Sequence, residues 1–353
     1  MNMPAAPLIG QPVDRAEDRR FLTGAGTFVD DLKRDGMLHA VVLRSSVAHG
    51  RINGIDASAA RARKGVRAVI TAAEIGETIP LIPLRLANLP EFAPYLQPVI
   101  AKDKVRYVGE PLAVVVAETQ ALAEDALEAI EVDIAPLPAV PDRHAAASGK
   151  SLLFEASGSN RAVRYSVSSG DADAAFAKAE YTRRESFRCH RLTAVPLETR
   201  GLIAEWDAAK ERLVIFGATK VLFFNRRVLA PMLGLAEHAI DMIELDVGGG
   251  FGVRGEFYPE DFLIPFAARH VGRPVKWIED RREHLMATNH SREVDCDLEV
   301  ACTRDGIILG LRGHIYGDMG AYIRTNGGVV PAKAGQFLPG PTASATWPSP
   351  SKR

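Results

Sequence analysis

The segment that most constrains this chain is 244–261, which reads ELDVGGGFGVRGEFYPED. Four glycines fall within five positions around Phe251, and each costs roughly 0.5–1 kcal/mol in unfolded-state entropy. Glycines at this density let a backbone come close to another group. A strand pattern, AIDMIELDV, precedes the loop and a helix pattern, PEDFLIPFAARHVG, follows it. We therefore expect a strand–loop–helix unit whose loop approaches something closely.

Strand and helix patterns alternate along the rest of the 353-residue chain. β-Branched runs at 36–46 and 104–119 indicate strands, and helical spacing follows Thr119, a cap candidate. The pattern predicts a first α/β domain that folds on its own. The expected segments are an extended arm at 1–20, a first domain at 21–137, an Ala/Ser/Gly-rich linker at 138–160 and a second domain at 161–341.

Local signals in the second domain predict particular boundaries. Asp171 is the expected cap of a helix that leads into a strand. Hairpins are predicted to turn at 207–210 and at 305–306. The helix after the glycine loop should hold Pro259 in its first turn and end before Gly272.

Charge and cysteine content exclude several classes of protein. Lys plus Arg is 43 and Asp plus Glu is 44, so nothing favours nucleic acid or an anionic membrane as a partner. No apolar run reaches the ~18–20 residues that span a bilayer, and the N-terminus does not resemble a secretory signal. Cys189, Cys296 and Cys302 form no C-x-x-C pair. We expect free thiols in a reduced cytoplasm, and neither an iron–sulfur cluster nor a protein-ligated metal.

The glycine loop has three interpretations that its residues alone leave open. Gly250, Gly252 and Gly255 fit the G-x-G-x-x-G pattern of a dinucleotide fold, and Glu279 lies where a ribose-binding acid would follow. The residues EFYP, however, separate the last glycine from the helix, which in that fold begins inside the motif. The second interpretation is a tight turn or bulge. The third is a loop laid against a planar anionic cofactor, with amides as donors and Phe251 over one face.

A family resemblance favours the third interpretation. The stretch VGGGFGVRGEFYPEDFLIPFAARHVGRPVKWIEDRREHLMATNHSRE resembles the first molybdopterin-binding domain of the xanthine dehydrogenase, aldehyde oxidase and carbon monoxide dehydrogenase large subunits. RRFLTGAGTFVDDL, VLRSSVAHGRI and VRYVGEPLAVVVAET resemble the α/β-hammerhead domain that precedes it, and AVPLETRGLIAEWD and GDMGAYIRTNGG continue the match. The resemblance covers about 19–341. It implies an α+β protein, with a hammerhead domain followed by an incomplete first molybdopterin-binding domain.

The resemblance also implies a cofactor and partner subunits. The cofactor is molybdenum held by a pyranopterin, often in the cytosine dinucleotide form, and the reaction is hydroxylation of an electron-poor carbon with water as oxygen source. Iron–sulfur clusters and FAD carry the electrons away in this family. Because this chain lacks cluster ligands, those centres are expected on an iron–sulfur subunit and an FAD subunit.

Site residues follow by position from the same resemblance. Gly249, Gly250, Phe251 and Gly252 match the loop beside the molybdenum ligands, and Arg254 matches a basic position after it. Their alternative roles are structural: Phe251 as a core aromatic and Arg254 as an exposed charge. Two further positions then depart from relatives. Lys220 stands where many members place a glutamine, and Gly255 stands where purine oxidisers carry a substrate-binding glutamate.

Several family features have no counterpart in this sequence. The second molybdopterin-binding domain and the general-base glutamate are among them, so no catalytic residue is assigned. Residues 342–353, TASATWPSPSKR, look non-native, and we hypothesise a frameshifted or prematurely ended gene product.

Three functions therefore stay open. The first is the N-terminal part of a hydroxylase that acts on an aldehyde, an N-heterocycle or a similar small substrate, inactive as an isolated chain. The second is a catalytically silent fragment, or a subunit completed by a second chain that carries the C-terminal half. A weaker alternative is an NAD-binding oxidoreductase.

Overall fold

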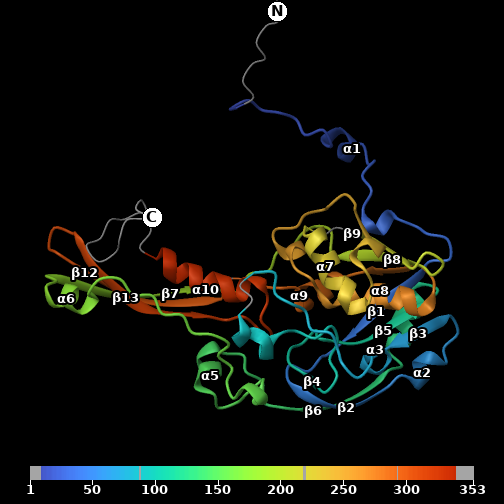
Figure 1. Ribbon diagram of the computed structural model, residues 1–353, viewed down its shortest axis with the longest axis horizontal. Helices are drawn as coiled ribbons and strands as arrows, with labels where there is room; N and C mark the ends of the chain where they lie inside the picture. The colour runs from blue at the N-terminus through green and yellow to red at the C-terminus, as the bar shows by residue number, and fades with distance from the viewer. Residues whose placement is uncertain (1–8, 87–88, 218–219, 292, 339–353) are drawn as a thin grey trace, which may run out of the picture.

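The computed structural model describes residues 9–86, 89–217, 220–291 and 293–338. The first eight residues of the expected arm and the tail at 342–353 lie outside the described residues. Figure 1 shows one body built on a large sheet, a smaller sheet layer at the opposite end, and an N-terminal arm that leads away from the large body.

Helices and strands alternate along the described chain, as the sequence predicts. The helices are α1 Asp18–Leu22, α2 Ser58–Arg61, α3 Ala72–Ile75, α4 Gln120–Leu127, α5 Arg143–Ser148, α6 Ala172–Ala177, α7 Leu222–Leu233, α8 Pro259–Val271, α9 Arg281–Ala287 and α10 Thr325–Phe337. The strands are β1 Leu38–Arg44, β2 Gly50–Asp56, β3 Val66–Ile70, β4 Lys104–Val105, β5 Pro111–Ala117, β6 Glu131–Pro136, β7 Tyr181–Cys189, β8 Gly201–Asp207, β9 Arg212–Gly217, β10 Ile240–Glu244, β11 Val275–Ile278, β12 Val294–Cys302 and β13 Ile308–Gly317.

The large sheet has seven strands in the order β10-β9-β8-β11-β1-β5-β3. Strand β1, from the expected first domain, pairs in parallel with β11 from the second, with Leu38 opposite Val275. The boundary expected near residue 137 therefore divides the sequence but not the sheet. Independent folding of the first domain would leave an open edge along β1, which argues against that expectation.

Apolar cores cover both faces of this sheet. On one face α7 and α8 pack against β1, β5, β8 and β11, and on the other α2 and α4 pack against β3 and β5. Strand β5 contributes to both cores, because Val114 and Val116 point to the first and Ala113 and Val115 to the second. Alternation along a strand explains why this apolar run is buried on both sides.

Two three-stranded sheets complete the fold, in the orders β4-β2-β6 and β13-β12-β7. The predicted hairpins are confirmed, since β8 pairs antiparallel with β9 and β12 with β13. In the second sheet β7 is an edge strand with almost every residue exposed. This sheet lies beside α6 and α10, away from the large sheet (Figure 1).

Helix boundaries agree with the local signals. Thr119 caps α4 by accepting the amide of Leu122, and Asp171 caps α6 by accepting that of Ala174. Pro259 begins α8 and Gly272 follows its end at φ 65°. The expected linker contains a helix that we did not predict, α5, capped by Asp142.

Helix α10 is another that the sequence did not predict; it contains three glycines and Pro331, which are poor helix formers. Its position follows from packing: a Cβ added at Gly317 of β13 would lie 2.6 Å from the Pro331 ring. The missing side chain at Gly317 therefore admits the helix against the sheet.

Candidate cofactor-binding site

The glycine loop leaves β10 and reaches α8 through a single 3-10 turn at Val253–Gly255. Gly249 and Gly252 adopt φ of 106° and 100°, and Phe251 adopts φ of 48°. A Cβ at Gly249 would lie 3.0 Å from Pro196 and 3.1 Å from the Phe251 ring. Gly249 and Gly252 are thus needed by the chain's own backbone.

Gly250 differs from its neighbours. A Cβ there would meet nothing nearer than the Arg254 Cδ at 3.9 Å, and its φ lies outside the left-handed region. The fold of this chain therefore does not require glycine at position 250. A requirement there would have to come from a bound group.

The loop presents unused hydrogen-bond donors. The carbonyls of Gly250 and Gly252 accept the amides of Val253 and Gly255 at 2.9 and 3.0 Å. Within the described residues, the amides of 249–252 donate to no acceptor. Consecutive free amides in a turn with left-handed residues form a concave anion site. The Phe251 ring beside them is 80% exposed, so it is not the core aromatic of the alternative reading.

This geometry fits the oxygens of a molybdopterin cofactor. Free amides supply donors, Gly250 leaves room for close approach, and Phe251 supplies an apolar face. The set of groups suits a planar anion better than a bare cation, since the Glu198 carboxylate against the loop is paired with Arg254. Among the described residues, no group of three or more His, Cys, Asp or Glu is placed to hold a metal ion.

Arg254 lies behind the loop, not on its exposed side. Its side chain is buried, with Nε donating to the Gly249 carbonyl at 2.8 Å and Nη2 to the Glu198 carboxylate at 2.8 Å. The alternative of an exposed charge is therefore wrong. Direct contact between this guanidinium and a ligand on the outer face would require these bonds to break.

Lys220 is exposed and lies next to the end of the loop. Its amide donates to the Arg254 carbonyl at 3.0 Å, and its Cδ is 3.7 Å from where a Gly255 Cβ would be. Within the described part of the chain its ammonium forms no ion pair. A cation therefore lies next to Gly255 at the end of the loop, where it can add positive charge to an anion site.

The base of the loop is tied to the N-terminal arm. Both guanidinium nitrogens of Arg20, on α1, bind the carboxylate of Asp246, and the amide of Thr27 donates to it at 2.7 Å. These bonds lower the pKa of Asp246, with the Arg20 hydrogen bond as the largest cause. Segments more than 200 residues apart therefore meet where the loop begins.

Glu279 does not occupy a ribose-binding position. Glu279 is only 1% exposed, and its carboxylate binds Arg200 and His284. Burial is the largest single effect and opposes its ionisation, but the charges and hydrogen bonds of Arg200 and His284 together outweigh burial and lower the pKa to about 2. Because this acid is internally paired, the dinucleotide interpretation loses its ribose ligand.

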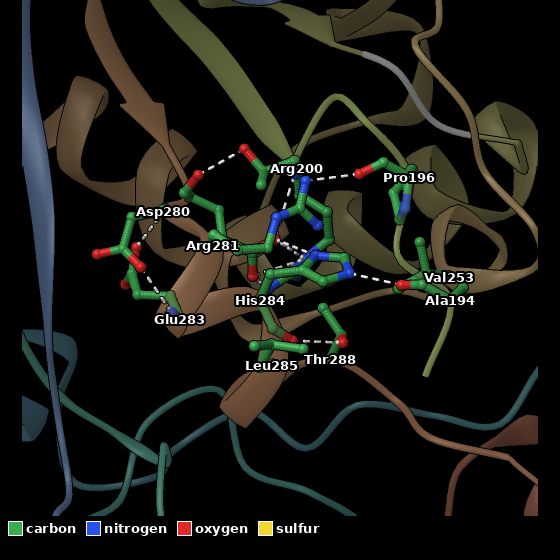
Figure 2. Close-up of polar contacts among 12 residues, drawn as sticks. Ala194, Pro196, Arg200, Val253, Asp280, Arg281, Glu283, His284, Leu285 and Thr288 are labelled. Atoms are coloured by element: carbon green, nitrogen blue, oxygen red, sulfur yellow. Dashed lines mark hydrogen bonds and ion pairs between the residues drawn. The ribbon is translucent and has the colours of Figure 1, made fainter. Parts of the chain in front are cut away.

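Figure 2 shows the polar cluster around His284, which the sequence did not reveal. The imidazole is fully buried, with Nδ1 2.8 Å from Glu279 Oε2 and Nε2 2.7 Å from the Ala194 carbonyl. Arg281, nearby, donates to the Pro196 carbonyl at 2.6 Å. The charged stretch ETRG at 198–201 was the only hint of this cluster in the sequence. It could not identify the partner of Arg200, because Glu279 lies about 80 residues away.

A cavity of about 1450 Å³ lies away from the glycine loop. It lies between segment 139–173 and the β12–β13 hairpin, lined by residues such as Tyr95, Arg106, Phe154 and Tyr316. We place the candidate site at the loop because the free amides and the close-approach glycine are there.

No described helix is long and apolar enough to cross a membrane.

Comparison with known proteins identifies both parts of the chain. Residues 23–138 match the aldehyde oxidase and xanthine dehydrogenase a/b hammerhead domain. Residues 154–343 match the molybdopterin cofactor-binding domain. These matches confirm the predicted order of the two parts in an α+β fold.

Individual relatives agree. The chain is 41% identical over 322 residues to 6-hydroxypseudooxynicotine dehydrogenase complex subunit gamma of Paenarthrobacter nicotinovorans, covering 90% of this chain and 40% of that protein. It is 38% identical over 322 residues to the carbon monoxide dehydrogenase large chain of Afipia carboxidovorans, covering 87% and 39%. The crystal structure of quinoline 2-oxidoreductase from Pseudomonas putida 86 matches with a TM-score of 0.80 at 35% identity, covering 88% and 39%.

The chain spans about 40% of the length of three of the curated relatives it matches. The two matched regions together account for most of its own length, in the order that the sequence predicted. The chain belongs to the molybdopterin-binding large-subunit family of the xanthine dehydrogenases, aldehyde oxidases and carbon monoxide dehydrogenases.

Proposed function

We propose that this chain supplies the glycine-loop side of the cofactor site in a molybdenum hydroxylase. The observation that carries the proposal is the row of free amides at 249–252 beside exposed Phe251. The cofactor, when bound, supplies the redox centre that oxidises a small substrate with water as the oxygen source.

The chain's own residues bind and orient. The amides of Gly249, Gly250 and Gly252 donate to cofactor oxygens, and the Phe251 ring covers one face and excludes water. Lys220, already beside the loop, adds a mobile donor as a point charge. We assign no residue of this chain to proton transfer, so we propose that the general base comes from elsewhere in the assembled enzyme.

The substrate class that we propose is an aldehyde, an N-heterocycle or a similar small molecule. Support comes from two relatives whose names refer to nicotine or its derivatives, at 41% and 38% identity. Glycine at position 255 provides no carboxylate for a purine. The cytosine dinucleotide form of the cofactor remains part of the same proposal.

Partner subunits complete the proposal. Relatives are named as subunits of a complex or as large subunits, and we propose an iron–sulfur subunit and an FAD subunit as the electron exit. A second chain carrying the C-terminal half would cover the exposed side of the loop. The three cysteines are free, which supports a reduced cytoplasmic location.

Replacing Gly250 with valine is expected to abolish molybdenum retention without loss of the fold. The added Cβ has room within the chain, at 3.9 Å from Arg254 Cδ, so a loss of molybdenum reports on the approach of the cofactor. Molybdenum is measured by elemental analysis of the complex purified from a host that makes molybdopterin, and folding is measured by thermal melting.

Gly54→Val is the matched control, because a Cβ at Gly54 meets nothing within 4 Å and the residue lies on exposed β2. This variant should keep the wild-type molybdenum content. Full retention of molybdenum in Gly250→Val would contradict the site assignment.

We also propose that the isolated chain turns over nothing. The loop side that carries the free amides is open, with Phe251 80% exposed, so a cofactor there would be covered on one side only. Assays of the purified chain with aldehydes or N-heterocycles and an artificial electron acceptor should give no molybdenum-dependent oxidation. Measurable turnover would reject this part of the proposal. If the assembled complex shows no molybdenum and no turnover, that result would favour a silent fragment.

A further inference from the structure

Segment 194–200 runs directly behind the glycine loop. The amide of Glu198 donates to the Gly248 carbonyl at 3.1 Å, and the Gly248 amide donates to Glu198 Oε2 at 2.8 Å. A Cβ added at Gly248 would lie 2.4 Å from the Glu198 Cβ. Glycine is therefore required at position 248 because the loop packs against segment 194–200, and not because a bound ligand approaches there.

Arg254 closes the other end of the loop onto the same segment. Its Nη2 donates to the Glu198 carboxylate at 2.8 Å and to the carbonyls of Glu198 and Thr199 at 2.9 and 3.0 Å. Its Nε donates to the Gly249 carbonyl. Burial lowers the pKa of Arg254, and the Glu198 carboxylate opposes that effect. One carboxylate oxygen, Glu198 Oε2, thus holds both ends of the loop.

Segment 194–200 is itself fixed from the side opposite the loop. Arg281 donates to the carbonyl of Pro196, and His284 contacts that of Ala194 (Figure 2). Arg281 also donates to the Leu197 carbonyl. The Thr199 hydroxyl donates to the Glu279 carbonyl. The segment is therefore anchored by residues outside the loop.

The loop apex, by contrast, is exposed on its outer side. Phe251 is 80% exposed with φ of 48°, a conformation that costs a non-glycine residue energy and persists only when its surroundings impose it. On the inner side, the bonds to Glu198 and Arg254 impose it. Without them we expect residues 249–252 to relax toward ordinary backbone angles and the amides to diverge.

We propose that Glu198 and Arg254 are a positioning pair that presets the loop amides for the cofactor, an inference that rests on the proposed function of the loop. Neither residue touches the cofactor. They act through the backbone: the pair holds four donors in the bound arrangement before binding, which removes an ordering cost.

Chymotrypsin cleavage after Phe251 tests the pair on the cofactor-free chain. A protease needs a loop that can unfold locally, so the fixed wild-type loop should be cut slowly despite its exposed ring. Glu198→Ala and Arg254→Met should be cut about tenfold faster, because each loses charge-assisted hydrogen bonds. Glu77→Ala, at an exposed carboxylate away from the loop, is the matched control and should be cut at the wild-type rate.

If the Glu198→Ala variant fails to fold, Glu198→Gln still tests the proposal. The amide oxygen can still accept from Gly248, but the charge opposite Arg254 is gone, so cleavage should rise about two- to fivefold. Cleavage sites are identified by mass spectrometry, which separates local opening at Phe251 from general unfolding. Wild-type cleavage rates at Phe251 in both Glu198→Gln and Arg254→Met, or an increase spread evenly over all sites, would overturn the proposal.

Molybdenum content of the assembled complex provides the second readout. Glu198→Gln should retain several-fold less molybdenum than wild type, at unchanged melting temperature. If the wild-type complex itself holds no molybdenum, the proposed function fails. The cleavage result still decides whether Glu198 and Arg254 hold the loop in place. If wild type and Glu198→Gln hold equal molybdenum, the loop functions without the pair and the inference fails alone.

Discussion

Replacing Arg200 with methionine is expected to lower the free energy of unfolding by about 3–5 kcal/mol, because it leaves buried carboxylates without their counter-charge. Arg200 binds Glu279 and Glu260, whose side chains are 0% and 2% exposed. Glu260 is shared with Arg44 of β1 at 2.7 Å. The guanidinium also lies 3.9 Å from the centre of the Tyr258 ring. The substitution therefore removes a charge, several hydrogen bonds and an aromatic contact together.

Denaturant unfolding measures this change, and Arg67→Met is the matched control. Arg67 pairs with Glu118, but the two side chains are 49% and 46% exposed, so its loss should cost less than about 1 kcal/mol. Equal effects of the two substitutions would show that the buried cluster adds no more than a surface pair. The Arg200 variant should also weaken the support behind the glycine loop, because the lost side chain binds Glu279, whose carbonyl accepts the hydroxyl of Thr199 in segment 194–200.

Replacing Leu38 with alanine should destabilise both sequence regions at once, by about 2–5 kcal/mol, through a cavity in the shared core. Leu38 is fully buried on β1, opposite Val275 of β11, and packs in the core that contains α7 and α8. Hydrogen exchange followed by mass spectrometry should show lost protection in peptides from both 21–137 and 201–278. The reason is that the two regions form one sheet and unfold together.

Leu22→Ala serves as the control, since this side chain is 87% exposed and its loss should change stability by less than about 0.5 kcal/mol. If Leu38→Ala lowers protection only within 21–137, that region behaves as a separate folding unit. The expectation of an independent first domain would then be restored.

Local sequence determined the elements whose partners are near in the chain. Thr119 and Asp171 cap helices because a side-chain oxygen reaches an amide three residues on. Pro259 suits the start of α8 because the first turn of a helix does not use the backbone N–H that proline lacks. Gly272 suits its end because glycine tolerates a left-handed φ. The crowded glycines likewise predicted a loop of special backbone, and Gly249 and Gly252 confirm it.

Tertiary structure decided which side of that loop each residue faces. Sequence order placed Arg254 among the cofactor residues, yet burial and Glu198, 56 residues away, turn it inward. Glu279 fits a ribose-binding spacing, but a fixed spacing cannot reveal that Arg200 and His284 already occupy its carboxylate. Strand β1 is legible as a strand in the sequence, while its neighbour β11 lies more than 200 residues on. Such pairings depend on long-range packing and desolvation, which no local pattern of residue types encodes.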